Sequence, residues 1–441
     1  MLNRRQAVVG AAAMGLASTA AARGAARAAM RPVNPQFPDG FLWGAATAGH
    51  QVEGNNVNAD IWLLEQVRPT SFAEPSGDAA NSFLQWRDDL ALVSAMGLNS
   101  YRFSLEWSRI EPAPGEFSIA MLDHYKTMIE ECRARNIAPL VSFNHFTTPR
   151  WFAAMGGWHH VDAPQIFARY CDRAARHLAG PISHATTLNE PNLSGLLQDL
   201  LPGDLLAADR ATQEGAARAM GSDRFSSGSA LYVANPPVFR ANQLAAHRLG
   251  RAAIKAVRGD LPVGVTLAIL DEQAVRGGEA RRDAVRERFY GEWLRAARED
   301  DFVGVQNYER KIWNRDGVVP PPPGPRNMMG AEVFPGSLAG AVRYAHAVSG
   351  RPVIVTEHGV GTDDDAVRAA LIPAALRELK LAMDDGVPVH GYIHWSLVDN
   401  FEWLFGYRIR FGLHSLNRTT FARTPKPSAA VYAAIARANR L

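Results

Sequence analysis

The sequence has few cysteines and no local metal-binding pattern. Cys132 and Cys171 are the two cysteines among 441 residues, so a disulfide framework is not expected. Both fall within apolar helical patterns, where core packing is the expected role. Neither an HExxH nor a CxxC pattern occurs. We therefore expect no metal and no other cofactor.

A net positive charge is also lacking outside the first residues. Residues 1–28 contain four arginines, no lysine and no acidic residue; without those arginines the formal net charge changes from +3 to −1. A basic surface for nucleic acid is therefore not implied. Beyond this segment no stretch is long and apolar enough to span a bilayer, so stable membrane insertion is not expected.

Residues 1–28 have the pattern of a signal peptide. Arg4-Arg5 precede the Ala-rich apolar run Ala7–Ala22, and Ala26-Arg27-Ala28 is typical of a cleavage site. The paired arginines predict twin-arginine export of a bacterial protein to the periplasm or the exterior. A disordered N-terminus and a retained membrane anchor are the alternatives.

Residues 29–441 alternate between short apolar runs and amphipathic helical patterns. The predicted strands are Phe41–Ala48, Ser100–Leu105, Ala138–Phe143, His184–Leu188, Leu261–Leu270, Phe302–Tyr308, Pro352–Thr356 and Val389–Trp395. The predicted helices are Asn81–Met96, Met121–Cys132, Ile166–Ala174, Val238–Val257, Asp283–Arg298, Ser337–Val348, Asp364–Met383 and Pro427–Arg440. Asp60–Gly77 is expected to be a loop. Eight strands, each followed by a helix, predict one α/β domain, a (β/α)8 TIM barrel.

Chemistry in such barrels occurs at the carboxyl ends of the strands. The polar and aromatic residues expected there are Gln51, Arg102, Asn144, His145, Asn189, Glu190, Asn307, Tyr308, Glu357 and Trp395. Glu190 and Glu357 are two acids that follow or end distant strands. A buried carboxylate is costly unless it has partners. Two carboxyls facing each other across a sugar are what glycoside hydrolysis requires.

Six ordered motifs carry a family resemblance. They are FLWGAATAGHQVEG (41–54), YRFSLEWSRIEP (101–112), TLNEP (187–191), VQNY (305–308), VTEHG (355–359) and HWSLVDNFEWLFGYRIRFGL (394–413). From about Phe37 to the C-terminus the chain resembles family 1 glycoside hydrolases, the retaining β-glucosidase family. The resemblance implies an exo-acting β-glycosidase, above all a β-glucosidase, that acts on small-molecule β-glycosides.

The resemblance also implies residue roles. Glu190 would be the general acid/base and Glu357 the nucleophile, with Arg102 and Tyr308 keeping Glu357 charged. A retaining mechanism would place the two carboxyls roughly 5–5.5 Å apart. The positions that match the family's glycone-binding residues are Gln51, His145, Asn189, Glu402 and Trp403, and Trp395 would offer its apolar face. Residues 401–412 lack the Ser and Lys that hold a sugar phosphate, so an unphosphorylated sugar is expected.

The chain departs from the family pattern at several places. His358 replaces an Asn after the nucleophile; it would either alter the hydrogen bonding of the nucleophile or cap the loop, and we favour the loop cap. Phe146 replaces a Trp, which removes a donor near the glycone and weakens strict glucose specificity. The segment between the fifth and sixth strands is short, and the loop 192–237 after Glu190 is long. These changes predict a rebuilt leaving-group pocket and a preference for aryl or other natural-product glycosides.

Two further hypotheses remain open at this stage. A transglycosylase would use the same intermediate and pass the sugar to an acceptor hydroxyl, and the residues do not separate it from a hydrolase. A catalytically inactive sugar-binding barrel would not need both Glu190 and Glu357. The sequence leaves the oligomeric state open.

Overall fold

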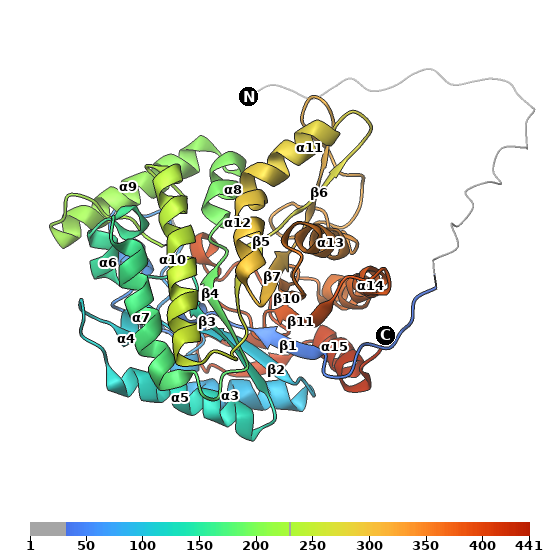
Figure 1. Ribbon diagram of the computed structural model, residues 1–441, viewed down its shortest axis with the longest axis horizontal. Helices are drawn as coiled ribbons and strands as arrows, with labels where there is room; N and C mark the ends of the chain where they lie inside the picture. The colour runs from blue at the N-terminus through green and yellow to red at the C-terminus, as the bar shows by residue number, and fades with distance from the viewer. Residues whose placement is uncertain (1–31, 229–230) are drawn as a thin grey trace, which may run out of the picture. The chain divides into compact units, whose positions relative to one another are not determined.

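The structure, a computed structural model, describes residues 32–228 and 231–441 (Figure 1). The chain divides into the units Met1–Val33 and Asn34–Leu441, and only the second is described below. The predicted signal peptide, residues 1–28, lies outside the described residues. Within the described ranges, no helix has the length and apolarity needed to cross a membrane.

Eight parallel strands close into a barrel in the order β1-β11-β10-β7-β5-β4-β3-β2. They are β1 (Leu42–Ala46), β2 (Ser100–Ser104), β3 (Ala138–Asn144), β4 (His184–Asn189), β5 (Val263–Ala268), β7 (Phe302–Asn307), β10 (Val353–His358) and β11 (Val389–Trp395). Their residues are almost all buried, because helices cover the outer face and side chains fill the inside. The eight predicted strands and the TIM barrel are thus confirmed.

The predicted helices surround this barrel (Figure 1). They are α3 (Ser82–Ala95), α5 (Ile119–Ala134), α7 (Ala163–Leu178), α10 (Pro236–Val257), α13 (Ser337–Ser349), α14 (Asp365–Asp384) and α15 (Pro427–Ala438). The helix predicted over 283–298 is instead composite: α11 (Glu279–Arg286), the π-helical turn η2 (Glu287–Gly291), α12 (Glu292–Ala296) and the 3-10 turn η3 (Ala297–Glu299). Cys132 and Cys171 are free and buried on α5 and α7, as predicted.

The loop predicted over Asp60–Gly77 is wrong for its first part, which forms α2 (Asp60–Gln66). The buried Asp60 carboxylate accepts hydrogen bonds from the backbone N–H of Ile61, Thr148 and Gly228, at 2.7, 3.0 and 2.7 Å. These contacts anchor the start of the helix from far along the chain, so local sequence gave no sign of it.

The long loop predicted after Glu190 is also largely helical. It contains α8 (Leu193–Leu200) and α9 (Gly203–Met220), and α9 is rich in alanine, a strong helix former. Three shorter helices lie elsewhere: α1 (Gly49–Val52), α4 (Trp107–Ile110) and α6 (Arg150–Ala154). Outside the barrel, β6 (Asp271–Ala274), β8 (Arg310–Trp313) and β9 (Val318–Val319) form a small sheet, and β12 (His414–Leu416) pairs with β13 (Arg423–Pro425).

Candidate active site

The Glu357 carboxylate near the end of β10 receives three hydrogen bonds. Its Oε1 accepts from Arg102 Nη1 at 2.5 Å and from Gln306 Nε2 at 2.9 Å, and its Oε2 accepts from the Tyr308 hydroxyl at 2.5 Å. Burial raises the pKa of Glu357, while the Arg102 cation and the Tyr308 and Gln306 donors oppose that rise. The surroundings of Glu357 are therefore built to hold an anion.

The Glu190 carboxyl has different surroundings. Glu190 follows β4 with a positive φ of 44°, and its backbone N–H donates to Thr266 O at 2.9 Å. No described residue forms a hydrogen bond to its carboxyl group. Burial, and then the charges of Glu357 and Glu402, raise the pKa of Glu190 well above its usual range, against the opposing effect of Arg102. The proton of the pair therefore favours Glu190 over Glu357.

The Asn189 side chain, at the end of β4, forms hydrogen bonds with Arg102, Gln306 and His145. Its Oδ1 accepts from Arg102 Nη2 at 2.6 Å and from Gln306 Nε2 at 2.7 Å, which fixes the amide orientation. Its Nδ2 then donates to His145 Nε2 at 3.1 Å. Burial lowers the pKa of His145 well below its usual range, so the ring is neutral and carries its proton on Nδ1. That buried Nδ1 has no partner within the described chain and remains able to donate to a ligand.

Gln51 on α1 and Glu402 lie together. Gln51 Nε2 donates to Phe401 O at 2.7 Å and to Asn400 Oδ1 at 3.1 Å, with Glu402 Oε2 3.4 Å away. Gln51 Oε1 is buried and unpartnered among the described residues, so it is an acceptor available to a hydroxyl group. Burial and the charge of Glu357 raise the pKa of Glu402 to about 8.

Aromatic rings form one wall of the site. Trp395, at the end of β11, lies 5.8 Å from the His145 ring at 19°, and Trp403, in the 3-10 turn η4 (Trp403–Phe405), lies 6.2 Å from it at 15°. Phe146 packs edge-on against Trp403 at 5.4 Å. The residues to which the family resemblance gives roles thus lie in one cluster: Gln51, Arg102, His145, Asn189, Glu190, Tyr308, Glu357, Trp395, Glu402 and Trp403.

Gln306 was missed by the sequence analysis, and Asn307 was wrongly placed at the rim. Side chains alternate along a strand, so Gln306 and Tyr308 face the same side and Asn307 faces the other. Accordingly Asn307 Nδ2 donates to Ile269 O at 2.8 Å, and its Oδ1 accepts from the Ser337 hydroxyl at 2.8 Å. The period-two pattern was the signal that could have identified Gln306.

The interpretation of His358 as a loop cap is also wrong. His358 is the last residue of β10, is buried, and its Nδ1 lies 2.8 Å from the Tyr392 hydroxyl. Burial lowers the pKa of His358 to about 3, so the ring is neutral. It packs beside the site and makes no hydrogen bond to Glu357.

Comparison with known proteins agrees with this geometry. Residues 33–203 and 319–441 match the family model "Glycosyl hydrolase family 1". The beta-glycosidase BGL167 is 45% identical, with 91% of this chain and 97% of that chain covered and a TM-score of 0.85. The beta-glucosidase 1317 is 41% identical, with 90% of this chain and 98% of that chain covered and a TM-score of 0.86. A bifunctional beta-D-glucosidase/beta-D-fucosidase of Bifidobacterium breve is 29% identical over 89% of this chain and 96% of its own length.

The family match leaves residues 204–318 uncovered. That stretch includes most of the segment after Glu190 and the short connection between the fifth and sixth barrel strands, where the sequence departs from the family pattern. It nevertheless supplies β5 and β7, so the barrel closes as in the relatives. With the match covering more than half of its length, the chain belongs to glycosyl hydrolase family 1 and is a β-glucosidase-like glycoside hydrolase.

Proposed function

We propose that the protein is a retaining exo-β-glycosidase, above all a β-glucosidase, that releases the terminal non-reducing β-D-glucosyl residue. Glu357 acts as nucleophile and forms a covalent glycosyl-enzyme, and Glu190 acts as general acid and then as general base toward water. The observation that carries this assignment is the contrast between three donors on Glu357 and none on the Glu190 carboxyl.

The same contrast explains how Glu190 changes role. Before reaction, the negative charge of Glu357 raises the pKa of Glu190 and keeps it protonated. When Glu357 becomes an ester, that charge disappears and the pKa of Glu190 falls. The deprotonated Glu190 then removes a proton from the attacking water. Arg102 and Tyr308 stabilise the Glu357 carboxylate before it attacks the sugar and again when water displaces it from the sugar.

The glycone is read by groups on both sides of the cluster. His145 Nδ1 supplies a donor and Gln51 Oε1 an acceptor, Asn189 and Glu402 contact hydroxyls, and the Trp395 and Trp403 rings stack on the sugar's C–H faces. Because Phe146 offers no donor, discrimination at the glycone is reduced. The Bifidobacterium breve relative is named for both glucosidase and fucosidase activities, and we expect β-D-fucosides to be substrates here too.

A mechanism-based label tests this proposal. An aryl 2-deoxy-2-fluoro-β-glucoside should inactivate the enzyme and leave one glycosyl group on the peptide that contains Glu357, as read by mass spectrometry. A label on another residue would overturn the nucleophile assignment. Aryl β-glucosides, galactosides and fucosides compared side by side then rank the sugars. Product analysis with an added alcohol separates hydrolysis from transglycosylation.

The leaving-group side is proposed to favour aryl or other natural-product aglycones. Support comes from the segment 192–237, which begins directly after the Glu190 strand end and contains α8 and α9. Hydrolysis of cellobiose as fast as of aryl glucosides would contradict this preference.

We also propose that residues 1–28 direct twin-arginine export. Replacement of both Arg4 and Arg5 by lysine should leave the protein in the cytoplasm with its leader uncleaved, whereas the unmodified chain is found outside it. Equal fractionation of the two proteins would contradict the proposal.

A further inference from the structure

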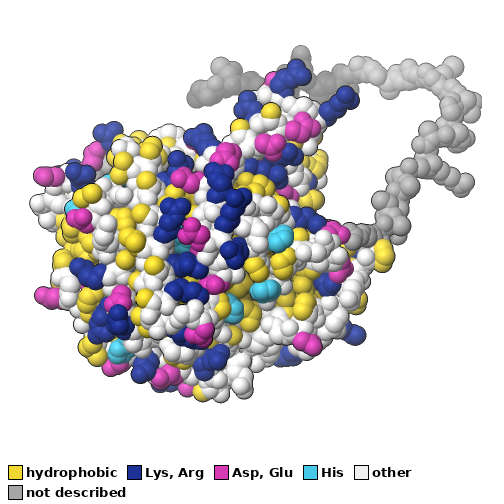
Figure 2. All heavy atoms as spheres, in the orientation of Figure 1, with side chains coloured by type: hydrophobic (Ala, Val, Ile, Leu, Met, Phe, Trp, Pro, Cys, Tyr) yellow, Lys and Arg dark blue, Asp and Glu magenta, His cyan; other side chains and the backbone are white. Residues whose placement is uncertain are grey.

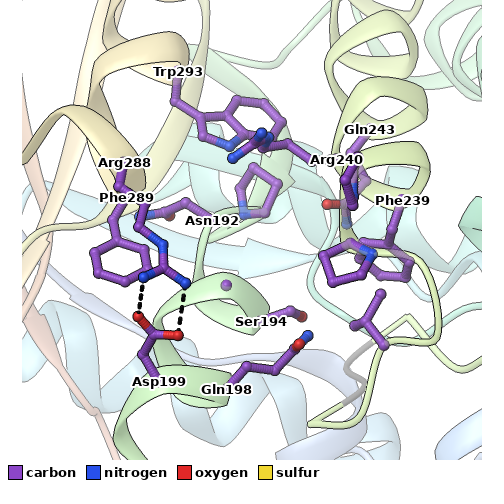
Figure 3. A pocket seen from close by; sticks show the side chains of 15 residues that line it. Asn192, Ser194, Gln198, Asp199, Phe239, Arg240, Gln243, Arg288, Phe289 and Trp293 are labelled. Atoms are coloured by element: carbon purple, nitrogen blue, oxygen red, sulfur yellow. Dashed lines mark hydrogen bonds and ion pairs between the residues drawn. The ribbon is translucent and has the colours of Figure 1, made fainter. Parts of the chain in front are cut away.

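A second cavity of about 250 Å³ lies behind the Glu190 strand end, between α8, α10 and the η2–α12 segment (Figure 3). It meets the loop after Glu190 at Pro191 and Asn192. The Asn192 side chain is already used: it bonds Ala268 O at 2.7 Å and Ala268 N at 3.1 Å. The cavity therefore borders the active site only at Pro191 and at the Asn192 side chain, whose amide is already hydrogen-bonded. None of the proposed catalytic or glycone-binding residues lines it.

Three buried polar atoms of residues that line this cavity have no partner in the described chain, and one of them is Gln198 Nε2 on α8. Gln243, 4% exposed, leaves Oε1 unpaired, and Trp293, 1% exposed, leaves Nε1 unpaired. Figure 3 shows the Gln243 side chain extending from its helix into the cavity, with Trp293 on the opposite helix. Unpaired buried groups cost free energy, so a ligand or water that pairs with both is favoured.

The charged groups at this cavity are neutralised by their neighbours. Arg288 pairs with Asp199 at 2.6 Å, and Arg240 pairs with Glu292 at 3.1 Å. Figure 2 shows Lys and Arg side chains over α10 and α12 with Asp and Glu side chains among them. A phosphate, a carboxylate or an amine would have to compete with an existing ion pair. A neutral ligand would not.

Much of the remaining wall is apolar and includes Val233, Pro237, Phe239 and Phe289, with Ser194 and Gln198 as further polar residues on α8. A cavity of this size holds about eight water molecules at the volume of the liquid. An aromatic ring that displaces them gains contact with the Phe and Pro side chains. A hydroxyl is the neutral group that both donates and accepts, as Gln243 Oε1 and Trp293 Nε1 together require.

We propose that this cavity is a binding site for an uncharged aromatic alcohol, whose hydroxyl donates to Gln243 and accepts from Trp293. Such a molecule could be the alcohol released from an aryl glycoside or one taken up directly from solution. The site does not depend on the roles assigned to Glu190 and Glu357.

Isothermal titration of the full chain with p-cresol tests the site, with toluene and glucose as comparison ligands. Toluene keeps the apolar ring and methyl group but lacks the hydroxyl, and glucose has hydroxyls without the aromatic ring. We expect p-cresol to bind more tightly than either. Gln243→Met, at similar volume, and Trp293→Phe, with a smaller ring, each remove one polar partner and should weaken p-cresol binding about fivefold, the scale of one neutral hydrogen bond. Both variants should retain aryl-glucosidase activity, which reports that they fold.

Trp403→Phe is the matched control for the cleft and should leave p-cresol affinity unchanged. The proposal is overturned if p-cresol does not bind, if toluene or glucose binds as tightly, or if Trp403→Phe rather than the cavity variants weakens binding. The last result would place the ring in the catalytic cleft. Because binding and not turnover is measured, failure here leaves the glycosidase assignment untouched.

Discussion

Glu357 lies near the end of β10 and Glu190 follows β4, with β7 and β5 between these two strands in the barrel. Both carboxyls are buried, 4% and 8% exposed, and burial raises the pKa of each. Their neighbours differ: Glu357 has a cation and two neutral donors, whereas Glu190 faces the charges of Glu357 and Glu402. The comparison teaches that equal burial does not give equal ionisation, and that donors decide which acid holds the proton.

The partners of Glu357 also come from two parts of the chain. Arg102 lies in the segment 33–203 that matches the family, while Gln306 and Tyr308 lie in the unmatched stretch 204–318. The unmatched stretch therefore does not lie apart from the site. It contributes Gln306 on β7 and Tyr308 directly after β7 as two donors to the proposed nucleophile.

Removing the better-supported carboxylate should have the largest effect. Glu357→Gln keeps the shape of the side chain but cannot form a glycosyl ester, and we expect kcat to fall roughly 10⁵-fold, on the scale of other nucleophile replacements. Steady-state kinetics with an aryl β-glucoside measures this.

The control is Glu272→Gln on β6, another buried glutamate, which accepts from the Tyr290 hydroxyl at 3.0 Å outside the site. It should keep nearly full activity. Azide should restore turnover to Glu357→Ala with an inverted glycosyl azide as product. Full activity in Glu357→Gln would mean that another group is the nucleophile.

Removing the unsupported carboxyl should give a loss that depends on the leaving group. Glu190→Gln cannot donate a proton, so alkyl glucosides should slow by about 10²–10⁴-fold. The dinitrophenolate group of a dinitrophenyl glucoside leaves without protonation, so the rate of forming the glycosyl-enzyme from such a substrate should change little. Initial rates for a series of aryl glucosides give the slope of log rate against leaving-group pKa. A slope unchanged from wild type would contradict the acid role of Glu190.

The pH profile offers the same test without a new variant series. Wild-type activity should fall at alkaline pH as the raised pKa of Glu190 is passed, and Glu190→Gln should lack this basic limb with activated substrates.

The barrel, and the grouping of most of the proposed site residues at one rim, could be predicted from the sequence because both depend on short patterns. Apolar runs alternating with helices fix the fold class, and the carboxyl ends of parallel strands meet at one rim. The helices α2, α8 and α9 could not be predicted in the same way. The buried Asp60 that starts α2 owes its partners to Thr148 and Gly228, far away in the chain.

Gln306 shows a different kind of miss. Its environment depends on which face of β7 points inward, and that choice was readable from Tyr308 two residues later. The prediction for His358 failed for the opposite reason. Its contact with Tyr392 joins the neighbouring strands β10 and β11, and local sequence gives no sign of such a contact.

Replacing Gln306 should give a smaller effect on the Glu357 side of the comparison. Gln306→Met removes the hydrogen bonds to Glu357 and Asn189, and we expect kcat to fall about tenfold. Since the Gln306 donor lowers the pKa of Glu357, its loss should raise that pKa and move the acidic limb of kcat/KM to higher pH. Asn307→Leu, on the other face of β7, is the control: it should lower stability without moving the limb. If the acidic limb of kcat/KM does not move in Gln306→Met, Gln306 contributes packing and does not affect the pKa of Glu357.

Glu106 separates the effect of neutral donors from that of a cation. Its carboxylate accepts from His50 N at 2.9 Å, Asn56 Nδ2 at 2.7 Å and the Thr147 hydroxyl at 2.8 Å, but no described cation lies within ion-pair distance. Burial, and then the charge of Glu53, raise the pKa of Glu106 from 4.5 to about 7. The stabilisation of the protonated form is therefore complete below 4.5 and is lost as the pH rises through about 7.

Glu106→Gln is neutral at every pH and should not lose this contribution. We expect its Tm to equal that of wild type near about pH 5 and to exceed it near about pH 8, with exposed Glu116→Gln as the control that follows wild type. If wild type is the more stable protein at the higher pH, three neutral donors are enough to keep a buried carboxyl ionised. The Arg102 cation would then no longer be needed to explain why Glu357 and Glu190 differ.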